Sequence, residues 1–166
     1  MKNLSFIIIT FCVFTSCQAQ TQKEIELINN FIKDLFEQNI SAKRVIRDYI
    51  QILPDSKNKL SISERINGAE EFVEMIRKGD KKENNWLIPN YAIEHIKKPK
   101  ICTYSECKDL NDIEINGIDN VRNRVYVLLS KDRNEILQYF LLNKDKDKIQ
   151  SFSLFIKGSK ASFFVF

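Results

Sequence analysis

The chain has 166 residues, of which 26 are Lys or Arg, 22 are Asp or Glu, and 43% are apolar. This length and apolar content are typical of one globular domain, and the balanced charge excludes disordered tails and low-complexity fibres. With one His and 4 Gly, the sequence lacks the residues on which most metal sites, phosphate-binding loops and His-based catalytic sites depend. We therefore expect no cofactor and no metal.

The first residues predict an export signal. Lys2 supplies a positive charge, and Leu4–Phe14 is an apolar run that is far shorter than the roughly 20 residues of a membrane-spanning helix. A buried N-terminal strand is the alternative interpretation of the same run.

The residues that end this run, Phe14-Thr15-Ser16-Cys17, resemble the lipobox of bacterial lipoproteins, although Phe14 stands where that family usually has Leu. The resemblance implies a signal peptide over residues 1–16, a mature N-terminus at Cys17 that carries palmitate, and a short tether through residue 22. Because Gln18 is not Asp, it also implies an exported protein anchored in the cell envelope, at the outer membrane. Ordinary signal-peptidase cleavage after Ala19 is the alternative.

The remaining thiols predict one disulfide. Cys12 leaves with the signal and Cys17 is acylated, so Cys102 and Cys107 remain in an oxidising compartment, where such a pair is usually bridged. The short loop would stabilise the fold by roughly 2 kcal/mol. A metal site made of His95, Cys102, Cys107 and Glu106 is the alternative, but its spacing matches no standard zinc site.

Residues 23–166 are expected to form a single domain that opens with three helices. The capping-box pattern Thr21-x-x-Glu24 begins the first helix, which ends near Asn39. Ser41 begins a second helix that runs to Pro54. The third begins at Ser61-x-x-Glu64 or at Asn67-Gly68, and Gly79 ends it.

Beyond residue 80 the pattern favours β-strands. The four clearest are joined by short polar turns and predict an antiparallel meander. The expected strands are Trp86–Ile96, Lys100–Tyr104, Ile113–Ile115, and then the meander of Val121–Ser130, Glu135–Leu142, Ile149–Ile156 and Lys160–Phe166. The fold class is therefore α+β, with N-terminal helices packed on a curved antiparallel β-sheet.

The third strand of the meander is apolar on both faces. Phe152, Leu154 and Ile156 lie on one face, and Ile149 and Phe155 on the other. A sheet with one solvent face does not need this pattern. It predicts a curved sheet around a pocket, a surface for a partner, or additional cover from the region 86–115.

Three helices followed by a bent meander weakly resemble the NTF2-like (nuclear transport factor 2-like) superfamily, and Ile66–Ile76 resembles its Gly-containing third helix. Cystatin-like folds share the order of elements. The NTF2-like resemblance implies a cone-shaped pocket, which serves both small-molecule enzymes and non-catalytic binding modules, so the fold leaves the function open.

The one acid-base group that the sequence offers is Tyr91 with Glu94 and His95. On a strand, Tyr91 and His95 share a face and could support a general base. Since no second catalytic candidate accompanies them, a solvent-exposed His95 is the simpler interpretation.

From these features we expect a non-catalytic, lipid-anchored module that binds a protein partner or a small apolar ligand. A small-molecule enzyme that uses His95 as its base is the alternative. Export argues against nucleic acid as a partner.

Overall fold

The computed structural model describes residues 21–54, 60–78 and 100–166, and every structural statement below concerns these residues. Its helices and mainly antiparallel sheets confirm the predicted α+β class. The predictions for Cys17, Gly79, Trp86–Ile96 and the group Tyr91, Glu94 and His95 lie outside the described residues. Within them, no helix combines the length and the hydropathy needed to cross a bilayer.

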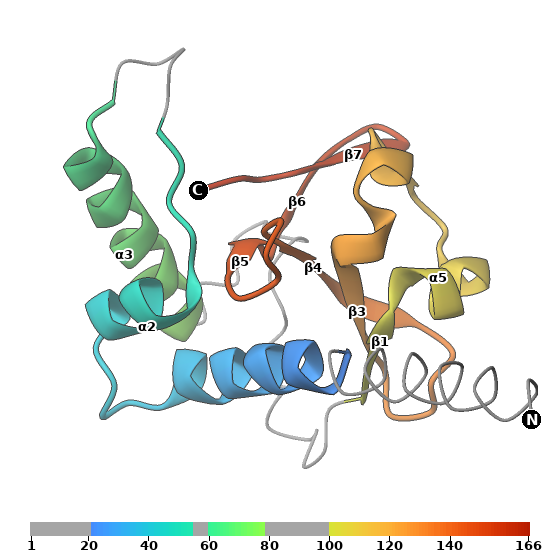
Figure 1. Cartoon of the computed structure of the whole chain (residues 1–166), viewed down its shortest axis with the longest axis horizontal. Helices are drawn as coiled ribbons and strands as arrows, with labels where there is room; N and C mark the ends of the chain where they lie inside the picture. The colour runs from blue at the N-terminus through green and yellow to red at the C-terminus, as the bar shows by residue number, and fades with distance from the viewer. Residues whose placement is uncertain (1–20, 55–59, 79–99) are drawn as a thin grey trace, which may run out of the picture.

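Three helices form one layer of the structure (Figure 1). They cover residues 21–36, Ala42–Tyr49 (α2) and Ile62–Lys78 (α3). Ser41 caps α2 as predicted, because its side chain accepts the Arg44 N–H at 3.3 Å. At α3 the N–H of Ser61 donates to Glu64 at 2.7 Å and the N–H of Glu64 donates back to Ser61 at 3.2 Å. This capping box selects Ser61 over Asn67 as the start of the third helix.

The predicted end of α2 at Pro54 is wrong. The helix ends at Tyr49, and Ile50 has an extended backbone with φ −100° and ψ 135°. Ile50 forms a parallel β-bridge with Ile149, and the N–H of Gln51 donates to the Ile149 carbonyl at 2.9 Å. The helical spacing of apolar residues continues through this segment, but the edge of a sheet offers β-branched Ile50 a competing partner.

The strands form two sheets. The first has four antiparallel strands in the order β1 (Lys100–Thr103), β3 (Val125–Leu129), β4 (Ile136–Leu142) and β5 (Ile149–Ser151). In the second, β7 (Lys160–Phe163) pairs with β2 (Glu114–Ile115) in parallel and with β6 (Leu154–Lys157) antiparallel. Along the chain, the segment between β1 and β3 also contains the short helix α5 (Tyr104–Cys107) and three 3-10 turns. These turns are Lys108–Leu110, Ile118–Asn120 and Arg122–Arg124.

The predicted four-stranded meander is wrong at its third strand. Ile149–Ile156 divides at Phe152-Ser153 into β5 and β6, which belong to different sheets. The Ser151 hydroxyl donates to the Ser153 carbonyl at 2.9 Å, so a local side-chain bond replaces a contact of the β-ladder. The four-stranded sheet is open, with β1 and β5 at its edges, and the NTF2-like cone stays a prediction.

Three other predicted boundaries shift. Val121–Ser130 becomes a strand only from Val125, and Tyr104 begins α5 instead of ending a strand. Strand β7 stops at Phe163, after which the chain turns to the helical layer. There the N–H of Leu53 donates to the Phe166 carbonyl at 2.8 Å, and the Phe166 ring stacks on Phe152 at 5.1 Å.

The second sheet explains why β3 is apolar on both faces. Alternate residues of β3 face opposite sides: Tyr126 and Leu128 pack in one core with the helices, while Val125, Val127 and Leu129 pack in a second core with Leu154 and Ala161. All five residues of β3 are buried. Both layers that cover β3 come from within the chain. The predicted two-faced strand Ile149–Ile156 is only partly covered, because Phe155 and Ile156 are 64% and 43% exposed in β6.

A buried charge connects the first helix to the sheet. Glu24 is 2% exposed, the Tyr126 hydroxyl donates to its carboxylate, and the Lys146 ammonium lies 3.2 Å from its Oε1. Lys146 occupies the left-handed position of the β4–β5 turn, with φ 58°. The predicted role of Glu24 in a capping box with Thr21 is therefore wrong, because residue 21 is already helical and Glu24 faces the sheet.

We expect Lys146→Met to lower the free energy of unfolding by about 2 kcal/mol. It leaves the Glu24 carboxylate buried without its cation, and the loss is below the largest values for buried pairs because the Lys146 side chain is 23% exposed. Adding Glu24→Gln should recover part of the loss. Urea unfolding measures all variants.

Lys144→Met is the matched control in the same turn, because Lys144 is exposed. Equal losses for Lys144→Met and Lys146→Met would contradict a structural role for the buried pair.

Candidate functional site

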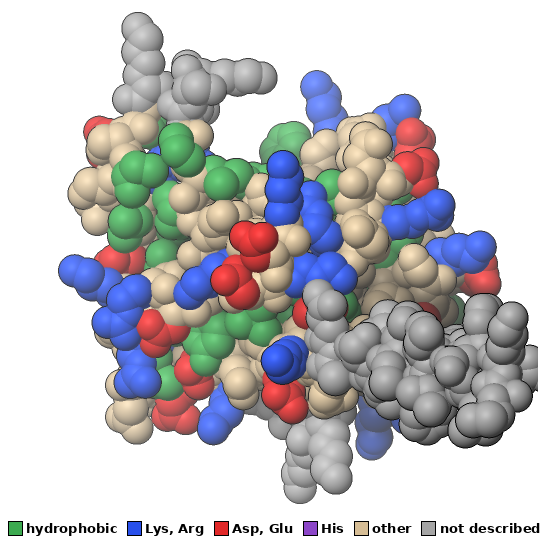
Figure 2. All heavy atoms as spheres, in the orientation of Figure 1, with side chains coloured by type: hydrophobic (Ala, Val, Ile, Leu, Met, Phe, Trp, Pro, Cys, Tyr) green, Lys and Arg blue, Asp and Glu red, His purple; other side chains and the backbone are tan. Residues whose placement is uncertain are grey.

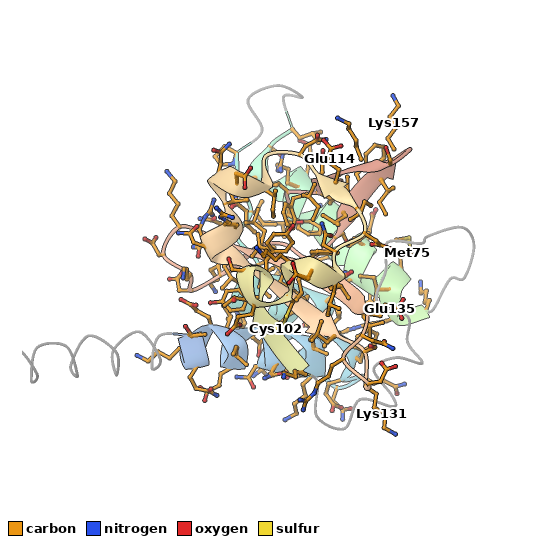
Figure 3. The ribbon with its side chains drawn as sticks, turned by 90° about the vertical axis from the view of Figure 1, so that its right-hand side faces the viewer. Met75, Cys102, Glu114, Lys131, Glu135 and Lys157 are labelled. Carbon is orange, nitrogen blue, oxygen red and sulfur yellow. A yellow bond between two sulfur atoms is a disulfide. The ribbon has the colours of Figure 1, made fainter. Side chains whose placement is uncertain are left out.

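The structure brings together the two predicted disulfide cysteines. Cys102 lies on β1 and Cys107 in α5, each 8% exposed. Their sulfur atoms are at bonding distance and their Cα atoms are 7.0 Å apart. Figure 3 shows Cys102 near the centre of the face that β1 and α5 present. The pair lies in the second core, where it fastens α5 to the edge of the four-stranded sheet.

The alternative metal site finds no support among the described residues. The two cysteines are bonded to each other, and the Glu106 carboxylate accepts the N–H and the hydroxyl of Thr103 at 2.9 and 2.8 Å. In residues 21–54, 60–78 and 100–166, no three His, Cys, Asp or Glu side chains gather in a way that would hold a metal ion. Glu106 thus completes the capping box with which Thr103 begins α5.

A groove on the helical layer has the composition of a ligand site. Its volume is about 420 Å³, and four isoleucines form its apolar floor. Ile46 and Ile50 come from α2 and its end, Ile52 from the extended segment that follows, and Ile66 from α3. We call it the isoleucine groove. The apolar floor exists because the chain leaves the helix at Ile50 and brings Ile52 beside α3.

Among the described residues, the charged groups that line the isoleucine groove are all cations: Lys43, Arg44 and Arg47. All three are exposed, and Figure 2 shows blue side chains over α2 with red ones among them. Arg44 and Arg47 share one carboxylate, that of Asp48, at 3.3 and 2.7 Å. Asp48 does not line the groove, and its pKa is lowered, chiefly by the hydrogen bond from Arg47. One carboxylate cannot neutralise three cations, so the rim of the groove stays positive.

Hydrogen bonds from other elements fix the helices around the groove. The Arg77 guanidinium of α3 donates to the carbonyls of Leu35 and Asp34 at 2.8 and 3.2 Å, where the first helix ends. The Lys148 ammonium donates to the Arg47 and Asp48 carbonyls at 3.1 and 2.6 Å, at the end of α2. Cations at these carbonyls also interact favourably with the helix dipoles.

Tyr49 joins α2 to the first helix, because its hydroxyl donates to Asp34 at 2.6 Å. Burial, and then this bond to a carboxylate, raise the Tyr49 pKa from 10.0 to about 12. The folded state therefore favours the neutral phenol. This contribution to stability is complete below the unfolded-state pKa near 10 and is lost as the pH rises toward 12.

We expect wild-type stability to fall between pH 10 and pH 12, and we expect Tyr49→Phe to remove part of that fall because the variant has no phenol to ionise at this position. Urea unfolding at pH 8, 10 and 12 measures the difference between the two proteins. Burial also raises the Tyr139 pKa, so the variant keeps some alkaline loss. Parallel curves for wild type and Tyr49→Phe would show that Tyr49 has no such role.

A second groove lies on the other side of the α2 start. It has a volume of about 770 Å³, and its lining combines Glu70, Glu71 and Glu74 with Lys43 and Lys78. Charges of both signs line it and Met75 is its largest apolar side chain, so it offers no preference for one class of ligand. The isoleucine groove is the better site on chemical grounds.

The described lining of the isoleucine groove offers no acid-base or nucleophilic group. The Ser41 hydroxyl of the isoleucine groove is occupied as the helix cap, and the described lining contains no His, Cys or carboxylate. The sequence interpretation missed this site. A signal was present, since Lys43, Arg44 and Arg47 flank the apolar stripe of one helix, a pattern typical of helices that bind anionic surfaces.

Comparison of this chain with protein-family models, with curated proteins and with solved structures finds no match. The function therefore has to be argued from the residues themselves.

Proposed function

We propose that this protein is a lipid-anchored, non-catalytic binding module of the bacterial cell envelope, and that its isoleucine groove takes an anionic amphiphile. The observation that carries the proposal is the pairing of an apolar floor with a rim whose described charged side chains are all cations. A ligand with a hydrocarbon chain and a carboxylate or phosphate end complements both parts.

The energetics favour such a ligand over a neutral one. Each CH₂ group that the isoleucines take from water contributes about 0.8 kcal/mol. A single anionic group placed between Arg44 and Arg47 gains charge-assisted hydrogen bonds, for which the planar guanidinium is well suited. The same rim disfavours a cationic amphiphile. The charge of the rim therefore selects anionic over cationic ligands, and the apolar floor contributes affinity for the hydrocarbon chain.

The proposed lipid anchor would place the groove close to a membrane surface. The lipobox-like residues before Cys17 and the short tether after it support a domain held close to a bilayer. Anionic amphiphiles are most concentrated at such a surface, where they are constituents of the membrane or products of its turnover. Stable anchoring needs two or more acyl chains, which a lipoprotein Cys supplies.

We expect decanoate to bind the full chain carrying Cys17→Ala about tenfold more tightly than decanol or decylammonium does, measured by isothermal titration calorimetry. Arg44→Gln combined with Arg47→Gln should lower decanoate affinity about tenfold, equivalent to about 1.4 kcal/mol. Ile66→Gln should weaken decanoate and decanol alike, since it changes only the floor.

Lys131→Gln combined with Lys157→Gln is the matched control, because both lysines are exposed and Figure 3 shows them at opposite ends of the molecule. Decanoate that binds no better than decanol would contradict the proposed groove. So would an equal loss of affinity in the lysine control.

A separate expectation concerns the anchor. Cys17→Ala should release the protein from the membrane fraction and abolish incorporation of labelled palmitate, because Cys17 is the proposed acylation site. Fractionation of cells followed by palmitate labelling measures both. Wild-type protein that is soluble after export and begins at Gln20 would instead establish ordinary cleavage after Ala19.

A further inference from the structure

A third cavity, of about 370 Å³, lies where the two sheets meet. Its lining comes from β4, from β6 and the β6–β7 turn, and from the residues just before β2. Figure 3 shows Glu114, Glu135 and Lys157, which are chain neighbours of the lining residues, on this face of the molecule. We call this cavity the Asp112 pocket. It is built from the sheets, whereas the isoleucine groove is built from the helices.

The walls of the Asp112 pocket are polar and apolar in about equal parts. Leu154 is buried at 6% exposure, Ile136 is half-buried, and Ile156 is 43% exposed. The exposed Ile156 is a side chain that a ligand could cover, and its burial would add to affinity. A cavity of this size suits a small molecule with one apolar body.

Three polar side chains of the pocket, those of Asp112, Gln138 and Tyr139, have acceptor oxygens, and the Ser159 hydroxyl can donate or accept. Gln138 is 6% exposed and its amide nitrogen donates to the Phe152 carbonyl, so the amide has its oxygen left to offer a ligand. The Tyr139 hydroxyl donates its proton to Asn111 Oδ1 at 2.6 Å, so it can only accept a hydrogen bond from a ligand. Asp112 adds a carboxylate.

The Asp112 carboxylate is the only charged side chain in the described lining of this pocket. Among the described residues, no Lys or Arg forms an ion pair with it. Burial raises the pKa of Tyr139, and the negative charge of Asp112 raises it further. The Asp112 charge therefore acts on a group that lines the pocket. The exposed Asp112 carboxylate therefore forms no ion pair with another described residue of the protein.

We propose that the Asp112 pocket binds an organic ammonium ion with a small apolar body. The ammonium group donates to the Asp112 carboxylate and to the Gln138 oxygen, and the apolar body covers Ile136, Leu154 and Ile156. Such a ligand is opposite in charge to the one proposed for the isoleucine groove, so each site excludes the ligand of the other.

Titration of the full chain carrying Cys17→Ala with 2-phenylethylammonium and with 2-phenylethanol tests the pocket, by calorimetry and by NMR chemical-shift mapping. The ammonium ion should bind roughly tenfold more tightly than the alcohol, as expected for a charge-assisted hydrogen bond. Asp112→Asn should abolish that difference. Glu114→Gln should preserve it, because Glu114 is exposed, is paired with Lys160 at 3.0 Å and does not line the pocket.

Ile156→Lys is a second variant that does not depend on Asp112. It places a cation in the pocket wall at an exposed position, so the fold should persist while affinity for 2-phenylethylammonium falls at least tenfold. Equal affinity for the ammonium ion and the alcohol would overturn the proposal. So would equal losses in Asp112→Asn and Glu114→Gln, or shifts that map to residues far from the pocket.

Discussion

The structure depends on the burial of both faces of the central strands β3 and β4. Every residue of β3 is buried, and its alternate side chains enter two separate cores. A strand of this kind needs two covering layers, and the chain provides the helices on one side and the small second sheet on the other. Surfaces available for binding are consequently found at the margins of the layers. The isoleucine groove lies between helices, and the Asp112 pocket lies where the sheets separate.

Local chemistry is what the sequence predicts well. Ser41 and Ser61 begin helices because their side chains satisfy exposed backbone N–H groups, and polar turns separate β3 from β4 and β4 from β5 as expected. The division of one predicted strand at Phe152-Ser153 could not be foreseen. Its apolar pattern is equally compatible with one long strand, and only the position of the second sheet decides where the chain must leave the first.

The same limit applies to the candidate sites. Pairing Cys102 with Cys107 follows from counting thiols, and the structure brings those sulfurs together. The isoleucine groove instead requires α2 to end at Ile50 so that Ile52 can approach Ile66. That ending is set by a bridge to Ile149, about a hundred residues away. Glu24 is similar, since a carboxylate in a plausible capping box serves instead as a buried partner of Tyr126 and Lys146.

The contact between Phe166 and the helical layer has a consequence for the kinetics of folding. Phe152 and Phe166 complete a core that begins with Ile28 and Phe31, so the helices depend on contacts of very high sequence separation. Contacts of this kind slow folding, because a long loop must close before they contribute. We therefore expect the helical layer to consolidate late, after the strands have formed. For a protein that is exported as we propose, this delay keeps the chain in a form that can still be threaded through a translocation pore.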